Sequence, residues 1–244
     1  MSDELKAGKV VRIGEGVTLI LGDCLAHMPI EADAVITDPP YGIGHVHSGK
    51  CSVNHGMNGG KPKQPIRKVV VGDSGPFDPS PWIQYPIAIL WGANHYASKL
   101  PDRPCWLGWD KHLKEHGTSF SEWECAWTNL KARRARMFRL YWHGALRAGD
   151  ANAAEHLHPM QKPVELMAWC MEVAKLPTDA TVLDPYMGSG STAIACIRTG
   201  RKFIGCEIDP IHFATAEQRI RRELEVGTFD FPAQPDSASQ QPLL

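Results

Sequence analysis

The C-terminal third of the chain alternates short apolar runs with longer stretches of helical periodicity. Residues 181–183 form an apolar run, a glycine-rich turn follows, and residues 191–199 have the spacing of a helix. A second apolar run at 203–206 leads into another helical stretch at 211–225. Such an alternation requires a parallel sheet, because each helix carries the chain back across the sheet in a right-handed crossover. The pattern therefore predicts an α/β fold.

Five more runs of apolar or aromatic side chains extend this pattern toward the N-terminus. They predict strands of the same sheet at 17–21, 34–37, 87–91, 105–109 and 122–128. A helical turn is expected at 24–28 and a helix at 163–175, where a proline stands in the first turn. We therefore expect a doubly wound, mostly parallel, Rossmann-like sheet in a single domain over residues 1–226.

Length and composition bound the remaining possibilities. The chain has 244 residues, 43% of them hydrophobic and 22% charged, as in an ordinary globular domain. No apolar stretch reaches the roughly 18 residues of a membrane span, and the polar start lacks a secretory signal, so we expect a soluble cytoplasmic protein. Seven cysteines without a C-x-x-C pair are expected to be free thiols. We also expect a long loop at 42–80 and a disordered tail at 227–244.

The formal net charge of −1 hides a segregation of charge along the chain. Residues 42–72 carry five basic side chains and no acid, and residues 131–147 carry six basic side chains and no acid. Two basic segments in an otherwise acidic chain are typical of a phosphate-binding surface, and the alternative is a pair of solvated faces. The candidate phosphate contacts are Lys50, Lys61, Lys63, Arg67, Lys68, Lys131, Arg133, Arg134, Arg136 and Arg139.

The segment LDPYMGSGST at 183–192 follows a predicted strand and opens a predicted helix. Backbone N–H groups and glycines at such a turn let a ligand approach closely. Glu207 ends the next strand, where a carboxylate can bind both hydroxyls of a ribose. The alternative is an ordinary turn followed by a surface acid. Since no G-x-G-x-x-G or G-K-[ST] pattern is present, a nucleoside without a pyrophosphate is favoured, and S-adenosylmethionine fits. The candidate ligand contacts are Asp184, Tyr186, Gly188, Ser189, Gly190 and Thr192.

The segment DPPY, from Asp38 to Tyr41, follows the predicted strand at 34–37. Pro39 and Pro40 fix the backbone and remove two N–H donors, so the carbonyl groups there are free to accept from a ligand. An Asp38 oxygen and a proline carbonyl together match the two hydrogens of an amino group, and Tyr41 offers a flat surface for a base. The alternative is a rigid turn, because Asp and Pro are common in turns.

The segment HPMQKP precedes the predicted helix at 163–175. Its His158, Gln161 and Lys162 could hold a carboxylate at the start of that helix, and the alternative is a loop that ends at a helix-initiating proline. Another group of possible ligands lies in the long loop: His45, His47, Cys51 and His55. Their spacing matches no familiar zinc site, so no metal is expected.

Together these segments resemble the β subgroup of amino-group DNA methyltransferases, whose members modify adenine N6 or cytosine N4. DPPY, HPMQKP, LDPYMGSGST and GCEID stand in this order in the chain. The resemblance implies S-adenosylmethionine as cofactor and a methyltransferase sheet in circularly permuted motif order, with a catalytic half at 10–157 before a cofactor half at 158–226. It also implies that Asp23 holds the cofactor adenine. Tyr186 stands where the family usually has Phe, and Met160 where it often has Thr.

The implied activity is methylation of the N6 amino group of an adenine flipped out of double-stranded DNA. Asp38 and the Pro39 carbonyl would accept the two amine hydrogens, and Tyr41 would stack on the base. Two alternatives stay open: methylation of cytosine N4, which presents the same NH₂ group, and a DNA-binding protein without activity. Loop 42–80 and segment 131–147 are expected to recognise DNA, and pairing of two copies into a homodimer is a further hypothesis.

Overall fold

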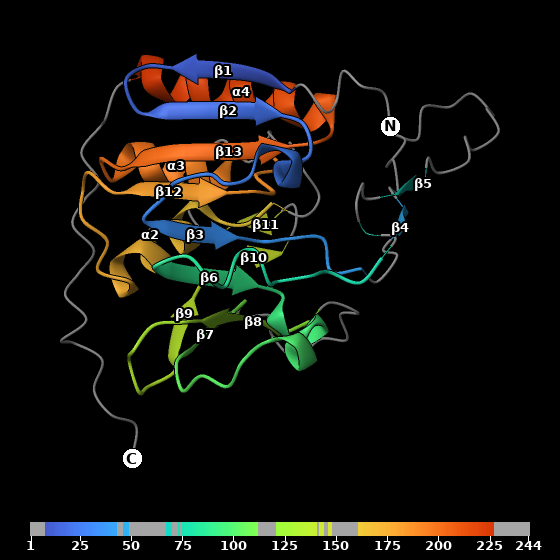
Figure 1. The fold of residues 1–244 in the computed structure, drawn as a ribbon, viewed down its shortest axis with the longest axis vertical. Helices are drawn as coiled ribbons and strands as arrows, with labels where there is room; N and C mark the ends of the chain where they lie inside the picture. The colour runs from blue at the N-terminus through green and yellow to red at the C-terminus, as the bar shows by residue number, and fades with distance from the viewer. Residues whose placement is uncertain are drawn as a thin grey trace.

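A computed structural model gives the fold (Figure 1). It describes residues 8–42, 46–48, 67–69, 73, 75–111, 121–140, 142–143, 146–147 and 161–226.

The described residues form one nine-stranded mixed sheet, in the order β1-β2-β13-β12-β3-β6-β8-β7-β9. In that order the strands are Lys9–Ile13, Val17–Leu21, Lys202–Glu207, Thr181–Asp184, Ala34–Thr37, Ile87–Trp91, Trp123–Thr128, Trp106–Asp110 and Arg136–Arg139. The five neighbouring strands β2, β13, β12, β3 and β6 run parallel to one another. The mostly parallel α/β sheet predicted from the sequence is confirmed, and each of its predicted strands is present within one or two residues.

Antiparallel pairs extend the sheet on both sides of its parallel centre. β1 pairs antiparallel with β2, β8 pairs antiparallel with both β6 and β7, and β9 pairs parallel with β7. The two edge strands, β1 and β9, were not predicted. Val10 and Met137 are exposed on them, so neither strand shows the buried apolar run by which the other strands are recognised.

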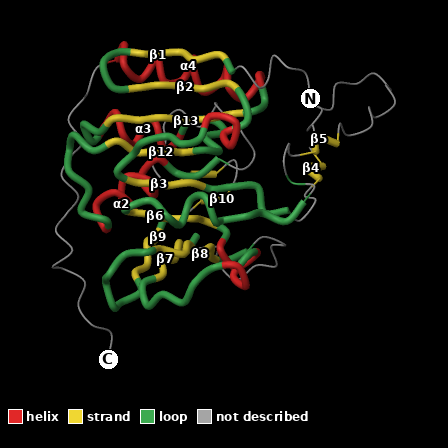
Figure 2. Tube along the Cα trace, viewed as in Figure 1, coloured by secondary structure: helices red, strands yellow, loops and turns green. Residues whose placement is uncertain are grey.

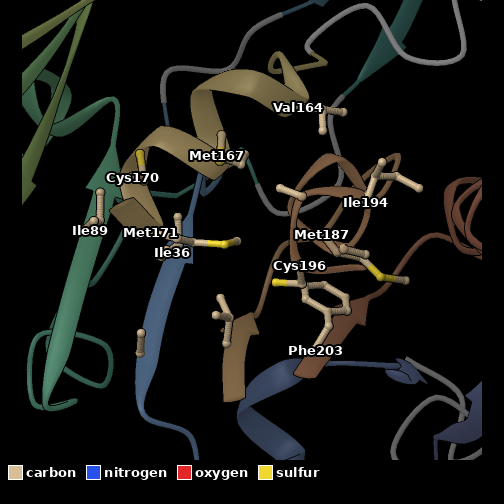
Figure 3. Packing of buried hydrophobic residues seen from close by; sticks show 14 of the residues in the cluster. Ile36, Ile89, Val164, Met167, Cys170, Met171, Met187, Ile194, Cys196 and Phe203 are labelled. Atoms are coloured by element: carbon tan, nitrogen blue, oxygen red, sulfur yellow. The ribbon is translucent and has the colours of Figure 1, made fainter. Parts of the chain in front are cut away.

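The three described α-helices pack on one face of the sheet (Figure 2). They are α2 at Val164–Val173, α3 at Ser191–Arg198 and α4 at Pro210–Val226. Ile36 and Ile89 of the sheet and Met167, Cys170 and Met171 of α2 belong to the core between the two layers (Figure 3).

The opposite face of the sheet has a different cover. Alternate strand residues such as Val35 and Leu90 pack there against Phe77, Trp82 and Tyr96. The cover includes the 3₁₀ helix η1 at Cys24–His27, and a second one, η2, follows β6 at Ala93–His95. The expectation of a doubly wound sheet is therefore met on one face only, since among the described residues loops and 3₁₀ turns, rather than α-helices, cover the other.

The region predicted as a long loop contains secondary structure. β4 at Val46–Ser48 pairs antiparallel with β5 at Arg67–Val69 in a separate two-stranded sheet (Figure 2). The expectation of a loop without strands at 42–80 was therefore wrong. Outside that region a second small pair joins β10 at Trp142–His143 to β11 at Leu146–Arg147. The sequence did not reveal these strands, because a strand of two or three residues is too short to show periodicity.

Gly42 and Asp73 bring the two ends of that region together. The Gly42 N–H donates to the Asp73 carboxylate at 2.6 Å, and Asp73 is buried. Gly42 has a φ of +75°, and a Cβ at this position would lie 2.3 Å from the Gly75 carbonyl oxygen. Only glycine fits so close an approach, so the two ends of the region between Gly42 and Asp73 lie side by side.

Several other expectations concern single features. None of the helices in the described ranges is both long and apolar enough to cross a bilayer. Six of the cysteines are buried free thiols, as predicted, and Cys51 lies outside the described residues. The other three side chains considered for zinc, His45, His47 and His55, and the tail at 227–244 also lie outside the residues whose side chains are described.

Candidate active site

The candidate site lies where the parallel strands end. Asp23 follows β2, Asp38 follows β3, Asp184 ends β12 and Glu207 ends β13. Because these strands are parallel and adjacent, their carboxyl ends meet at one edge of the sheet. The connections diverge between β12 and β3, since β12 leads to β13 on one side and β3 leads to β6 on the other. Open α/β sheets bind their ligands at such a switch point.

Asp38 is held from two sides. Its Oδ1 accepts a hydrogen bond from the Tyr41 hydroxyl at 2.5 Å, and its Oδ2 accepts one from the Lys162 ammonium. Burial raises the pKa of the Asp38 carboxyl, and the adjacent Lys162 charge limits that rise. For Lys162, burial favours the neutral form, but Asp38 and Glu124 hold its pKa well above the usual 10.5. Lys162 therefore stays charged beside Asp38.

Tyr41 is fixed by the turn after β6. Its ring stacks on His95, with ring centroids 4.6 Å apart and an interplanar angle of 15°. Gly92 has a φ of +69°, and a Cβ there would lie 1.9 Å from Tyr41 Cε1, so only glycine leaves room for the ring. Burial and the charge of Asp38 raise the pKa of the Tyr41 phenol well above 10. The hydroxyl therefore stays protonated and donates to Asp38.

Two residues that the sequence did not single out complete this group. Glu124 of β8 lies with its Oε2 3.0 Å from Lys162 Nζ and its Oε1 2.5 Å from Lys111 Nζ. Burial favours the neutral form of Glu124, but Lys162 and Lys111 outweigh it and lower the pKa to about 2. One signal was available in the sequence, namely an acid inside the otherwise apolar run of β8. Lys111, Glu124, Lys162 and Asp38 form a row of alternating charge, the charge row.

Asp184 sits one strand away from Asp38, and none of the described residues places a cation beside it. Its Oδ1 accepts from the Thr37 hydroxyl and its Oδ2 from the Thr192 hydroxyl, both at 2.6 Å, and the Tyr186 N–H also donates to Oδ1 at 3.2 Å. Burial raises the pKa of Asp184 to about 6, although these hydrogen bonds oppose the shift. Asp184 thus ties the end of β3 to the glycine-rich turn.

Glu207 holds that turn from the other side. Its Oε2 accepts from the Gly188 N–H at 3.0 Å, and its Oε1 accepts from the Asp209 N–H at 2.8 Å. Gly188 has a φ of +51°, and a Cβ there would meet no atom within 4 Å, so the turn opens onto free space. Burial raises the pKa of Glu207 against the effect of these two bonds. Asp23, also predicted here, accepts from the Leu25 N–H and caps η1.

Arg219 of α4 connects two of the predicted segments. It donates to the Ser189 carbonyl at 3.1 Å, and the Gln161 side-chain oxygen accepts from its guanidinium at 3.0 and 3.2 Å. No local pattern signals this role, because Arg219 lies inside a helix with other charged residues. Tyr186 makes edge contacts with Phe77 and Trp82. His158 lies outside the described residues.

The structure describes the side chains of five of the ten predicted phosphate contacts. Five of them are exposed on β9 or just before it, at the edge of the sheet: Lys131, Arg133, Arg134, Arg136 and Arg139. Arg139 Nε lies 3.7 Å from Asp110 Oδ2. The side chains of the other five lie outside the description: Lys50, Lys61, Lys63, Arg67 and Lys68.

Two surface hollows lie elsewhere in the described part of the chain. One of about 490 Å³ is lined by Pro101, Arg103 and Trp106, and one of about 430 Å³ by Asn94 and Trp123. Neither is lined by Asp38, Glu207 or the glycine-rich turn. We assign the site to the strand ends, because the carboxylates of Asp38, Asp184 and Glu207 and the open glycine-rich turn converge there.

Comparisons with known proteins match parts of this chain to DNA methylases. Residues 109–218 match the N6/N4 methylase family, described as DNA methylase. A protein named as a methylase, YubD of Escherichia coli (strain K12), is 40% identical over 63 residues, 26% of this chain and 27% of that protein. The type II methyltransferase M2.LlaDCHI of Lactococcus lactis subsp. cremoris is 31% identical over 86 residues, 35% of this chain and 31% of that one. The matched segments thus span less than a third of either relative.

A solved structure matches the fold over more of the chain. The PvuII DNA methyltransferase, named as cytosine-N4-specific, aligns with a TM-score of 0.52 over 87% of this chain and 91% of that one, at 12% identity. This match supports the mixed, mostly parallel sheet, while the circularly permuted motif order stays a prediction.

Proposed function

We propose that this chain, whose residues 109–218 match the N6/N4 DNA methylase family, transfers a methyl group from S-adenosylmethionine to the N6 amino group of adenine in DNA. The observation that carries the proposal is the meeting of two differently held carboxylates at one sheet edge. Asp38 lies in a cationic, hydrogen-bonded setting, and Glu207 lies beside an open glycine-rich turn. The first suits an amine substrate and the second suits a ribose.

The residues around the glycine-rich turn fit S-adenosylmethionine. Glu207 would take the ribose hydroxyls, and the free space beside Gly188 leaves room for the nucleoside. Asp23 would hold the adenine, and Gln161, Lys162 and His158 would hold the methionyl carboxylate. When bound, the cofactor supplies an electrophilic methyl carbon on a sulfonium.

Asp38 and Pro39 would prepare the amine for attack. The nitrogen lone pair of adenine is delocalised into the ring, and hydrogen bonds from both N–H groups to Asp38 and the Pro39 carbonyl would draw it back toward the nitrogen. Both Asp38 oxygens already accept one hydrogen bond. A carboxylate oxygen has about two acceptor directions, so Asp38 can accept another. Tyr41, braced by His95, would stack on the flipped base.

Cytosine N4 methylation is the second candidate. The site addresses only an NH₂ group, which both bases present, and the PvuII enzyme that shares the fold is named as cytosine-N4-specific. An aspartate at position 38 favours adenine, because the resemblance associates Asp with adenine and Ser with cytosine at the start of this motif.

Double-stranded DNA is the proposed partner. The exposed basic side chains around β9 would contact phosphates, and loop 42–80 would contribute to recognition. A homodimer and a cytoplasmic location stay predictions, and light scattering at micromolar concentration decides the first.

Product analysis tests the proposal. Double-stranded DNA is incubated with the protein and methyl-labelled S-adenosylmethionine and is then digested to nucleosides. We expect labelled N6-methyldeoxyadenosine, formed about 10²- to 10³-fold more slowly by the Asp38→Asn variant. Labelled N4-methyldeoxycytidine would establish the alternative. DNA binding without label would show a protein that has lost catalysis.

A further inference from the structure

Glu124 is a half-buried acid, with its side chain 22% exposed, that the proposed chemistry does not yet use. It lies on β8, between β6 and β7, and pairs in register with Trp109 of β7. A carboxylate in an apolar strand is costly unless it is paired. Lys111, just after β7, satisfies one oxygen at 2.5 Å. The second oxygen is directed at the site.

Lys162 lies between Glu124 and Asp38. The Lys162 side chain is 7% exposed, and its ammonium donates to Asp38 while lying 3.0 Å from Glu124 Oε2. The approach to Glu124 has ion-pair distance but not hydrogen-bond geometry, and that oxygen has no hydrogen-bond partner among the described residues. Glu124 therefore attracts Lys162 as an ion-pair partner, and Asp38 is not the sole anion facing the ammonium.

We propose that Glu124 is a positioning residue for methyl transfer: through Lys162 it sets how the Asp38 carboxylate is held for the substrate amine. The inference rests on the function proposed above for Asp38. With Glu124 present, the charge row alternates in sign and has no net charge. Without Glu124, Lys162 would have only Asp38 as an anionic partner, would bind it more tightly, and would compete with the amine for its oxygens.

The inference has an electrostatic consequence. The groups that act on Asp38 are Lys162, Glu124 and Tyr41, and Asp38 in turn acts on Tyr96 and Asp184. Glu124 is the nearby anion that acts to raise the pKa of Asp38. Removing its charge should therefore lower that pKa and move the acid limb of the kcat profile to lower pH. A purely structural role for Glu124 would leave this limb in place.

The first experiment compares Glu124→Gln with the wild type. We expect kcat to fall by about 10- to 100-fold, as for a small displacement of a reacting group, with KM for DNA changed by about twofold or less. The control is Glu223→Gln, which breaks the half-buried Arg198–Glu223 pair between α3 and α4, away from the site. Glu223→Gln should lower the unfolding temperature and leave kcat within about twofold of the wild type.

A double-mutant cycle tests the route through Lys162. In a Lys162→Met background, Glu124→Gln should change kcat by about twofold or less, because the residue through which it acts is gone. Glu124→Asp should restore part of kcat. Equal losses in both backgrounds, or an unchanged kcat in Glu124→Gln, would overturn the inference.

A measurement on the ligand-free protein separates this inference from the proposed function. The Asp38 carboxyl carbon can be followed by NMR through a pH titration, with its signal assigned from Asp38→Asn. A lower Asp38 pKa in Glu124→Gln supports the inference, and an unchanged pKa overturns it. A wild-type protein that methylates no DNA would overturn the proposed function, and this titration would still decide the role of Glu124.

Discussion

Asp38 and Asp184 both lie at the carboxyl ends of adjacent parallel strands, yet the protein holds them in different ways. Asp38, after β3, is paired with the Lys162 ammonium and is tied through it to Glu124 and Lys111. Asp184, at the end of β12, meets neutral donors within the described part of the chain: the hydroxyls of Thr37 and Thr192 and one backbone N–H.

This difference gives the two carboxyl groups different surroundings. Burial raises the pKa of both groups, and for Asp38 the adjacent Lys162 ammonium opposes that rise. Neutral donors around Asp184 fix its position but compensate burial poorly, so its pKa rises to about 6. Asp38 is thus held by charge, and Asp184 by hydroxyl and amide donors.

Asp38→Asn should give the largest effect and tests the charged side of the comparison. The loss of one preorganised acceptor should lower kcat by about 10²- to 10³-fold, with the dissociation constant for S-adenosylmethionine nearly unchanged. Methyl-transfer kinetics and calorimetry measure the two quantities. Exposed Asp102→Asn is the matched control. Near-normal turnover in Asp38→Asn would make the two aspartates equivalent in role.

Asp184, which is surrounded by neutral hydrogen-bond donors, should make the free energy of unfolding depend on pH. Its folded-state pKa of about 6 lies above the ordinary 3.8, so the folded state binds the proton more tightly than the unfolded state. Stability from this group is present below about pH 4 and is lost as pH rises to about 6, by about 3 kcal/mol. Urea unfolding at several pH values should show this loss in the wild type relative to Asp184→Asn. Parallel curves would mean that Asp184 titrates normally.

Glu207→Ala probes the backbone-held carboxylate. Loss of a charge-assisted acceptor for the ribose should weaken cofactor binding by about 1.5–3 kcal/mol, measured by calorimetry. Glu207→Gln keeps one acceptor oxygen toward the turn and should lose less. If the two variants bind the cofactor as tightly as the wild type, the ribose is held elsewhere.

The smallest expected effect concerns the exposed cations around β9. Replacing Arg133, Arg134 and Arg136 with Ala should weaken binding to all DNA sequences and reduce the slope of log affinity against log salt by about 0.9 for each phosphate that is no longer neutralised. Lys9 and Arg12, exposed on β1 at the opposite sheet edge, provide the control pair. A slope unchanged in the triple variant would make the segment a solvated face.

Local sequence patterns predicted the segments that carry the site better than the distant residues that contact those segments. The DPPY segment and the glycine-rich turn could be placed at strand ends, because strands and turns leave local signals. Their partners Glu124 and Arg219 were not identified, because the contacts of both arise when β8 and α4 pack near segments distant in the chain, and the acid within β8 was the one local sign of Glu124. The same limit applies to Lys162, which was assigned to the cofactor and lies in contact with Asp38. Its role toward the cofactor stays a prediction.

The contact between Gly42 and Asp73 holds together the two ends of the segment that runs between them. A segment with its ends fixed side by side can change in length at little cost, because the entropy of closing a loop grows only slowly with its length. Under the function proposed above, this segment recognises DNA, and its sequence could then change while Asp38 and the glycine-rich turn stay as they are. A foreign segment grafted between the same two residues would change the target preference and leave the chemistry intact.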